Sequence, residues 1–181
     1  MALTKVQAGM NEDGSVGTTQ LANVSVTQAK LGTNVAGNGP TFYAKPSTTQ
    51  TVNNNVSTKV TFNTEVFDTN GNFDNTTNYR FTPTVAGYYQ VNLNVVFTGT
   101  VSRNYVFQTQ LYKNGSATTS TSTALTLGSG QDFGGTVSTI VYMNGSTDYL
   151  EGYVYQYDYS ATSSVTISTL SNFSAALVRA A

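Results

Sequence analysis

The chain has 181 residues, of which 9% are charged, and its formal net charge at neutral pH is −1. Its eight Lys and Arg residues are scattered, which excludes the clustered cations that proteins use to neutralise nucleic-acid phosphates. The sequence contains no His and no Cys, which excludes disulfides, ordinary zinc sites and His-dependent nucleophiles.

The first residues lack the apolar segment of a signal peptide, and no apolar run approaches the 18 residues of a membrane-spanning helix. We therefore expect assembly in a cytoplasm and no membrane insertion.

Residues 1–40 form the first predicted unit, an extended arm that contains no aromatic residue before its end at Pro40. Its apolar residues recur every five positions, which fits neither the helical period of 3.6 nor the strand period of two. The residues that share this spacing are Val16, Leu21, Val26 and Leu31. We expect the arm to dock on a partner through them; the alternative is a disordered tail.

The remainder, residues 41–181, reads as successive strands without helical periodicity, which predicts an all-β sandwich or barrel. The expected strands are 41–45, 56–67, 78–82, 87–98, 103–113, 118–127, 133–143, 148–159 and 164–178. Asn-Gly pairs at 70–71, 114–115 and 144–145 mark turns between them.

The segment 60–97 allows the most detailed prediction of strands and turns. Its first part is an apolar strand followed by Asn70-Gly71 and a second strand, the pattern of a type I′ hairpin. Pro83 and Gly87 should interrupt the pairing before a long alternating strand. Together with residues from later strands, this segment supplies the expected core: Phe62, Phe81, Tyr89, Val91, Leu93, Val95, Leu150, Val154 and Phe173.

The same segment resembles the C1q-like domain. The matching residues are Val60, Phe62, Asn70, Phe81, Pro83, Gly87 and Tyr89, followed by Lys113-Asn114-Gly115 and by the closing run 172–178. The resemblance covers roughly residues 41–181 and implies a jelly-roll sandwich that trimerises, as in tumour-necrosis-factor-like proteins. It implies no single function, because this fold hosts many.

A row of tyrosines is the second informative feature. Alternation along 149–159 places Tyr149, Tyr153, Tyr155, Tyr157 and Tyr159 on one face of a strand. Leu150 and Val154 lie on the other face and suffice for the core. Because tyrosine combines a large contact area with a hydroxyl group, we expect a homotrimer interface here. A sugar-binding aromatic surface and plain core are the alternatives.

Carboxylates are the remaining candidates for chemistry. A pair of acids could in principle serve a glycosidase, but turns and solvated strand edges explain these residues better, so we expect no enzyme and no cofactor. The acids are Glu65, Asp68, Asp74, Asp132, Asp148, Glu151 and Asp158. The run from Asp68 to Asp74 weakly resembles a calcium loop, although its Gly71 is misplaced for an EF-hand and a hairpin turn accounts for it.

The arm contains Gly-Ser-Val-x-Thr-x-x-Leu-Ala at 14–22 and Val-Thr-x-Ala-Lys-Leu at 26–31, and in these motifs it resembles linkers of tailed-phage fibre and virion proteins. We therefore expect a trimeric protein on a virion surface, assembled in the host cytoplasm and attached to other capsid or tail proteins through residues 1–39. A capsid decoration protein is the first expectation. A short tail or head fibre that binds a host surface glycan is the alternative, and a secreted C1q-type adhesin is disfavoured by the missing collagen-like repeat.

Overall fold

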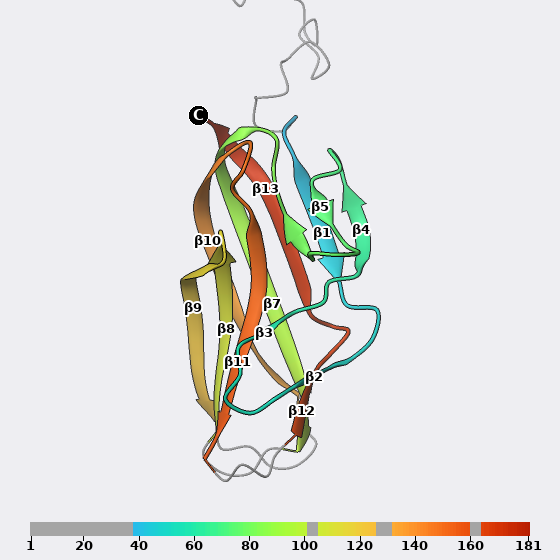
Figure 1. The fold of residues 1–181 in the computed structure, drawn as a ribbon, viewed down its shortest axis with the longest axis vertical. Coiled ribbons are helices and arrows are strands. Elements are labelled where there is room, and N and C mark those ends of the chain that lie inside the picture. Colours follow the sequence, from blue (N-terminus) through green and yellow to red (C-terminus); the bar gives the residue numbers. More distant parts are fainter. Residues whose placement is uncertain (1–37, 101–104, 126–131, 160–163) are drawn as a thin grey trace, which may run out of the picture. The chain divides into compact units, whose positions relative to one another are not determined.

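The computed structural model describes residues 38–100, 105–125, 132–159 and 164–181. These ranges form strands joined by turns, in two antiparallel sheets that pack face to face (Figure 1). The four apolar residues of the arm, Val16, Leu21, Val26 and Leu31, lie outside the described residues, so the docking role of the arm stays a prediction.

The first sheet has the strand order β2-β12-β7-β13-β1-β4, and β10 pairs with the free side of β7. Its strands are β1 (Thr41–Lys45), β2 (Gln50–Val52), β4 (Thr64–Asp68), β7 (Ala86–Thr100), β10 (Phe133–Asn144), β12 (Ser164–Ile167) and β13 (Asn172–Ala180). The long β7 organises this sheet, because β12 and β13 pair with successive parts of one side of it.

The second sheet has the order β5-β6-β11-β8-β9, and the short β3 also pairs with β11. Its strands are β3 (Thr58–Lys59), β5 (Phe73–Asp74), β6 (Arg80–Phe81), β8 (Tyr105–Lys113), β9 (Ser116–Leu125) and β11 (Leu150–Asp158). The chain crosses between the sheets repeatedly, as in a jelly roll.

Two predicted strands are each divided in the structure. The predicted strand 164–178 is broken between β12 and β13, where the Ser171 N–H donates to the Ser168 carbonyl. The predicted strand 56–67 is broken between β3 and β4 by two tight turns, in which Phe62 N–H donates to Val60 O and Asn63 N–H to Thr61 O. The sequence prediction also missed β2 and β5, which are too short to show a clear alternation.

The predicted hairpin around Asn70-Gly71 is wrong. The strand before this turn, β4, pairs with β1 in the first sheet, whereas the strand after it, β5, pairs with β6 in the second. Gly71 has a positive φ of 63°, but Asn70 does not, so the turn is not of type I′. This Asn-Gly pair therefore carries the chain from one sheet to the other.

Asn114-Gly115, by contrast, forms the expected hairpin. Its φ angles are 54° and 78°, as a type I′ turn requires, and it joins the paired strands β8 and β9.

The core lies between the sheets, and the predicted core residues are confirmed: all nine are completely buried. Along β7 the residues Tyr89, Val91, Leu93 and Val95 point inward, while the polar residues between them are only partly buried. Aromatic rings concentrate around Phe42, whose centroid lies 4.6 Å from that of Phe73 and 4.5 Å from that of Phe81. The strand period of two thus separates one buried face from one solvated face, as predicted.

Candidate interaction surfaces

Two sheet faces point away from the core, and each carries side chains suited to contact with another molecule. The first is the tyrosine face, the outer surface of β8 and β11. It comprises Tyr112, Tyr149, Tyr153, Tyr155 and Tyr157 with the flanking residues Lys59, Arg80 and Glu151.

The structure places the predicted row of tyrosines opposite the core. Leu150 and Val154 are completely buried, whereas Tyr153, Tyr155 and Tyr157 are partly exposed and Tyr159 at the end of the row is 67% exposed. The predicted alternation of buried residues and tyrosines along this strand is therefore confirmed. The molecule that the tyrosines contact stays a prediction.

Neighbouring groups hold the rings of the tyrosine face. Tyr153 stacks on Tyr112 with centroids 4.0 Å apart, and the Tyr155 hydroxyl donates a hydrogen bond of 2.7 Å to Asn55 Oδ1. Tyr157 contacts Tyr159 edge to face at 4.7 Å. Ordered side chains of this kind lose little conformational entropy when a ligand binds.

An ion pair lies within the tyrosine face. Glu151 is 4% exposed and accepts a hydrogen bond from the Lys59 ammonium group, which lies 5.7 Å from the Tyr153 ring centroid. Burial alone would lower the pKa of Lys59, but the hydrogen bond and charge of Glu151 outweigh it and raise that pKa. Sequence reasoning missed this pair, because Lys59 and Glu151 lie 92 residues apart.

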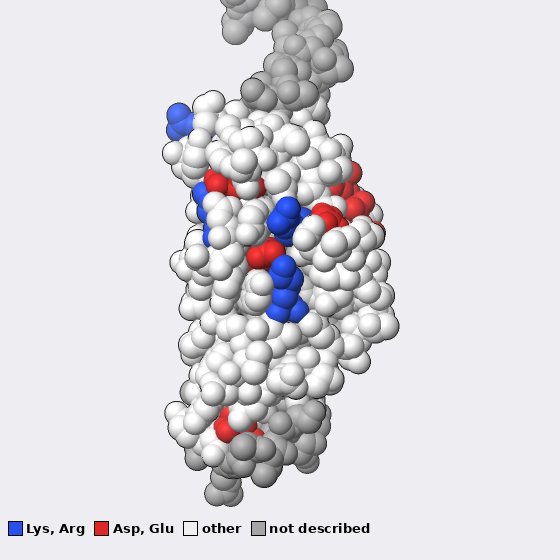
Figure 2. Space-filling model, in the orientation of Figure 1, with Lys and Arg blue, Asp and Glu red and all other residues white. Residues whose placement is uncertain are grey.

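Arg80 is the second cation of the tyrosine face, and its guanidinium lies 4.5 Å from the Tyr149 ring centroid. The ion pairs within the described residues join Lys59 to Glu151 and Lys113 to Asp148, so Arg80 takes part in neither. Figure 2 shows this face with basic and acidic groups side by side near the middle of a largely uncharged surface.

The second surface is the outer face of the first sheet, formed by β7, β10 and β13. Arg179 is the one charged residue in these three strands. Hydrogen bonds between Gln90, Ser138, Asn92, Thr136 and Asn94 cross its middle.

One end of this face is apolar. Tyr88, Ile140, Tyr142 and Val178 are each between 43% and 58% exposed, and the rings of Tyr88 and Tyr142 lie 5.4 Å apart. We call these four residues the apolar patch. Large side chains that are exposed together mark an interaction site more often than single ones do.

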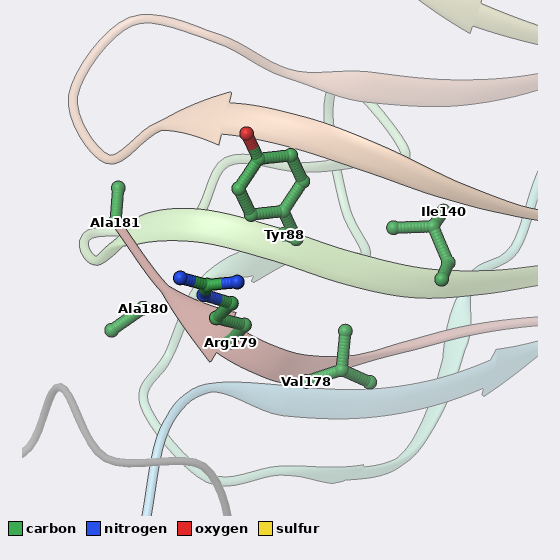
Figure 3. Close-up of a pocket in the computed structure, with 6 residues that line it drawn as sticks. All are labelled: Tyr88, Ile140, Val178, Arg179, Ala180 and Ala181. Atoms are coloured by element: carbon green, nitrogen blue, oxygen red, sulfur yellow. The ribbon is translucent and has the colours of Figure 1, made fainter.

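A bulge in β13 contributes to the apolar patch. The pairing of β13 with β7 shifts between Leu177 and Arg179, which leaves Val178 as the extra residue and exposes both Val178 and Arg179. An open pocket of about 550 Å³ lies here, lined by Tyr88, Ile140 and residues 178–181 from three adjacent segments (Figure 3).

The two carboxylates of the run from Asp68 to Asp74 accept hydrogen bonds from backbone N–H groups of nearby residues. Asp68 accepts hydrogen bonds from the N–H groups of Asn70 and Phe73, and Asp74 accepts from those of Thr76, Thr77 and Asn78. These backbone hydrogen bonds hold the pKa of Asp74 well below its usual range. Within the described ranges, no three acidic side chains gather as a metal site would require.

No helix long and apolar enough to cross a membrane occurs in the part of the chain that the structure describes.

The fold is similar to those of several solved structures. The globular domain of zebrafish complement 1qA protein aligns over 78% of this chain and 99% of its own, with a TM-score of 0.50 and 15% identity. The Eiger TNF of S. frugiperda covers 78% of this chain and 92% of its own, with a TM-score of 0.53 and 9% identity. Murine APRIL covers 77% and 98%, with a TM-score of 0.55 and 8% identity.

No family model matches the sequence, and no curated protein matches it either. The structural likeness nevertheless agrees with the sequence resemblance to C1q-like domains, and at these identities it extends to the fold alone. The described part of the chain therefore adopts a C1q/TNF-like jelly-roll fold, in which two antiparallel sheets enclose one core.

Proposed function

We propose that the protein is a non-enzymatic structural protein of a tailed-phage virion, a homotrimeric knob displayed on the particle surface and anchored by residues 1–39. The jelly-roll fold forms the knob, and the five-residue apolar spacing of the arm supports docking on a capsid protein. The decoration of a capsid is the role that we favour.

The observation that carries the trimer is the outer face of β7, β10 and β13. Interfaces are depleted of charge at their centre and enriched in Tyr and other large side chains. The three strands contain one charged residue, Arg179, which lines the pocket together with Tyr88, Ile140 and Val178, and four large exposed side chains form the apolar patch. A copy of the same chain is the partner that the C1q/TNF-like fold favours.

The tyrosine face is the other candidate for the subunit interface, and it was the one predicted from sequence. Its rings are already packed on one another, and two cations and a carboxylate lie among them. Burying these charges between subunits would cost more desolvation energy than burying the outer face of the first sheet, whose three strands carry only Arg179. We therefore favour the first sheet as the trimer interface.

A matched pair of substitutions distinguishes the two faces. Ile140→Glu places a charge in the apolar patch, and Tyr157→Glu places one on the tyrosine face. We expect light scattering to find Ile140→Glu as a folded monomer and Tyr157→Glu as a trimer. The reverse pattern would assign the interface to the tyrosine face.

The attachment role is tested on particles that lack the protein. Full-length protein should bind such particles, and a variant without residues 1–36 should not, although it should still form a trimer. Equal binding by both forms would assign attachment to the knob and contradict the docking arm. Neither form binding would contradict the virion assignment.

A short tail or head fibre that binds a host surface glycan is the second candidate function. The tyrosine face favours it, because an aromatic surface that carries an available cation suits a polar ligand such as a saccharide. In this role the arm would attach to a tail or head protein, and the face away from the trimer axis would meet the host.

A further inference from the structure

We infer that the tyrosine face binds a carboxylated saccharide, with sugar rings packed over Tyr149 and Tyr153 and the carboxylate on Arg80. This inference deepens the glycan-binding role proposed above and rests on it. It names the residues that form the site and the charge class of the ligand.

The aromatic part of the site is long enough for several sugar units. Tyr153 and Tyr157 lie four residues apart on β11, which corresponds to about 13 Å at the usual rise per residue, and Tyr149 directly precedes this strand. Tyr155 lies between them in the same row. A row of this length suits an oligosaccharide better than a single sugar, because each ring offers one apolar surface to one sugar unit.

The site is also ordered before any ligand binds. The stacking of Tyr153 on Tyr112 and the hydrogen bond from Tyr155 to Asn55 fix two of the rings. Preorganisation of this kind favours weakly bound polar ligands, because the side chains lose little freedom on binding.

The charge of the site selects an acidic ligand. Lys59, Arg80 and Glu151 sum to one excess positive charge, whereas the whole chain has a net charge of −1. Glu151 is matched by Lys59, so the excess lies on Arg80.

Within the described residues, no carboxylate forms an ion pair with Arg80. Asp74 pairs with Arg80 through the backbone of β5 and β6, but its side chain accepts hydrogen bonds from Thr76, Thr77 and Asn78. The planar guanidinium, held on the Tyr149 ring, can donate two parallel hydrogen bonds to a carboxylate. A neutral saccharide would leave this cation without an anion.

The binding test uses the full-length protein and two probes. The acidic probe is a tetrasaccharide of alternating glucuronic acid and N-acetylglucosamine, and the neutral probe is a tetrasaccharide of N-acetylglucosamine alone. Because the chain contains 12 Tyr and no Trp, ligand contact is measured by the change in tyrosine fluorescence and by calorimetry. We expect the acidic probe to bind at least tenfold more tightly than the neutral one.

Three variants locate the site. Arg80→Gln should reduce binding of the acidic probe to the level of the neutral one, and Tyr149→Ala should weaken both. Lys45→Gln, which removes an exposed cation from β1 in the other sheet, should change neither. Light scattering and thermal unfolding of each variant confirm that it is folded and assembled as the wild type is.

The possible results separate this inference from the proposed function. Absence of binding, equal binding of both probes, or an equal loss in Lys45→Gln and Arg80→Gln would each overturn the inference. A trimer that attaches to particles and yet binds neither probe would overturn the inference alone. A monomer that binds the acidic probe through Arg80 would support the site and contradict the proposed knob.

Discussion

At the scale of single residues, close packing between the two sheets constrains the sequence most. Gly152 lies on the core side of β11, where a Cβ atom would come within 2.8 Å of Leu93 Cδ1 and 2.9 Å of Phe62 Cε2. The alternation of β7 predicts the burial of Leu93. Nothing in the sequence indicates that Gly152 must be small, because this depends on a strand 59 residues away.

Leu93→Ala should lower the free energy of unfolding by about 2–5 kcal/mol, because it removes a completely buried side chain and leaves a cavity. Urea unfolding measures the difference. A variant with the stability of the wild type would show that the register of β7 is shifted by one residue.

Asp148 should make the free energy of unfolding decrease at acidic pH. Lys113 and Asn114 donate hydrogen bonds of 2.8 Å to its carboxylate, and they lower its pKa below the ordinary value of 3.8. The Asp148 carboxylate therefore takes up a proton at a higher pH in the unfolded chain than in the folded one. Its contribution to the free energy of unfolding is complete above pH 3.8 and is lost as the pH falls through the pKa of the folded state.

Asp148→Asn tests this dependence. Above pH 5 the variant should melt at a lower temperature than the wild type, and the gap should narrow as the pH falls below 3.8. A constant gap across this range, measured by thermal unfolding, would mean that the charge of Asp148 has no part in stability.

At the scale of elements, strand alternation could be predicted and turn geometry could not. The row of tyrosines and the inward face of β7 follow from a period of two that both strands keep. Asn70-Gly71 and Asn114-Gly115 have the same sequence, yet one crosses between sheets and the other closes a hairpin. The difference comes from the partner strand of β4, which lies far away in the sequence.

Gly115→Ala should destabilise the β8–β9 hairpin by about 1 kcal/mol, because its φ of 78° is costly for a residue with a Cβ atom. Ser116→Ala, at the next position, serves as the control and should be near neutral. Equal unfolding free energies for the two variants would contradict the type I′ geometry.

At the scale of the whole molecule, the sequence predicts the fold better than the surfaces. The jelly roll follows from many short strands and from the motif residues around Phe81 and Gly87. The apolar patch was missed because Tyr88, Ile140 and Val178 come from three strands, one of them with a bulge, that meet only in the folded sheet. Sequence reasoning missed Arg80 and Lys59 in the tyrosine face for the same reason, because they lie on β6 and β3, which meet β11 only in the folded sheet.

Removal of residues 1–36 should leave a folded knob, because this segment contains no aromatic residue and the long alternating strands lie beyond Thr41. The truncated protein should keep the melting temperature and the oligomeric state of the full chain. A truncated protein that unfolds or dissociates would show that the arm belongs to the knob.

The central claim is that the sparsely charged outer face of β7, β10 and β13 joins three copies of the chain. The most direct test is the mass of the full-length protein in solution, measured by light scattering at micromolar concentration. We predict a single species at three times the chain mass of 19.2 kDa. A monodisperse species of 19.2 kDa would contradict the claim.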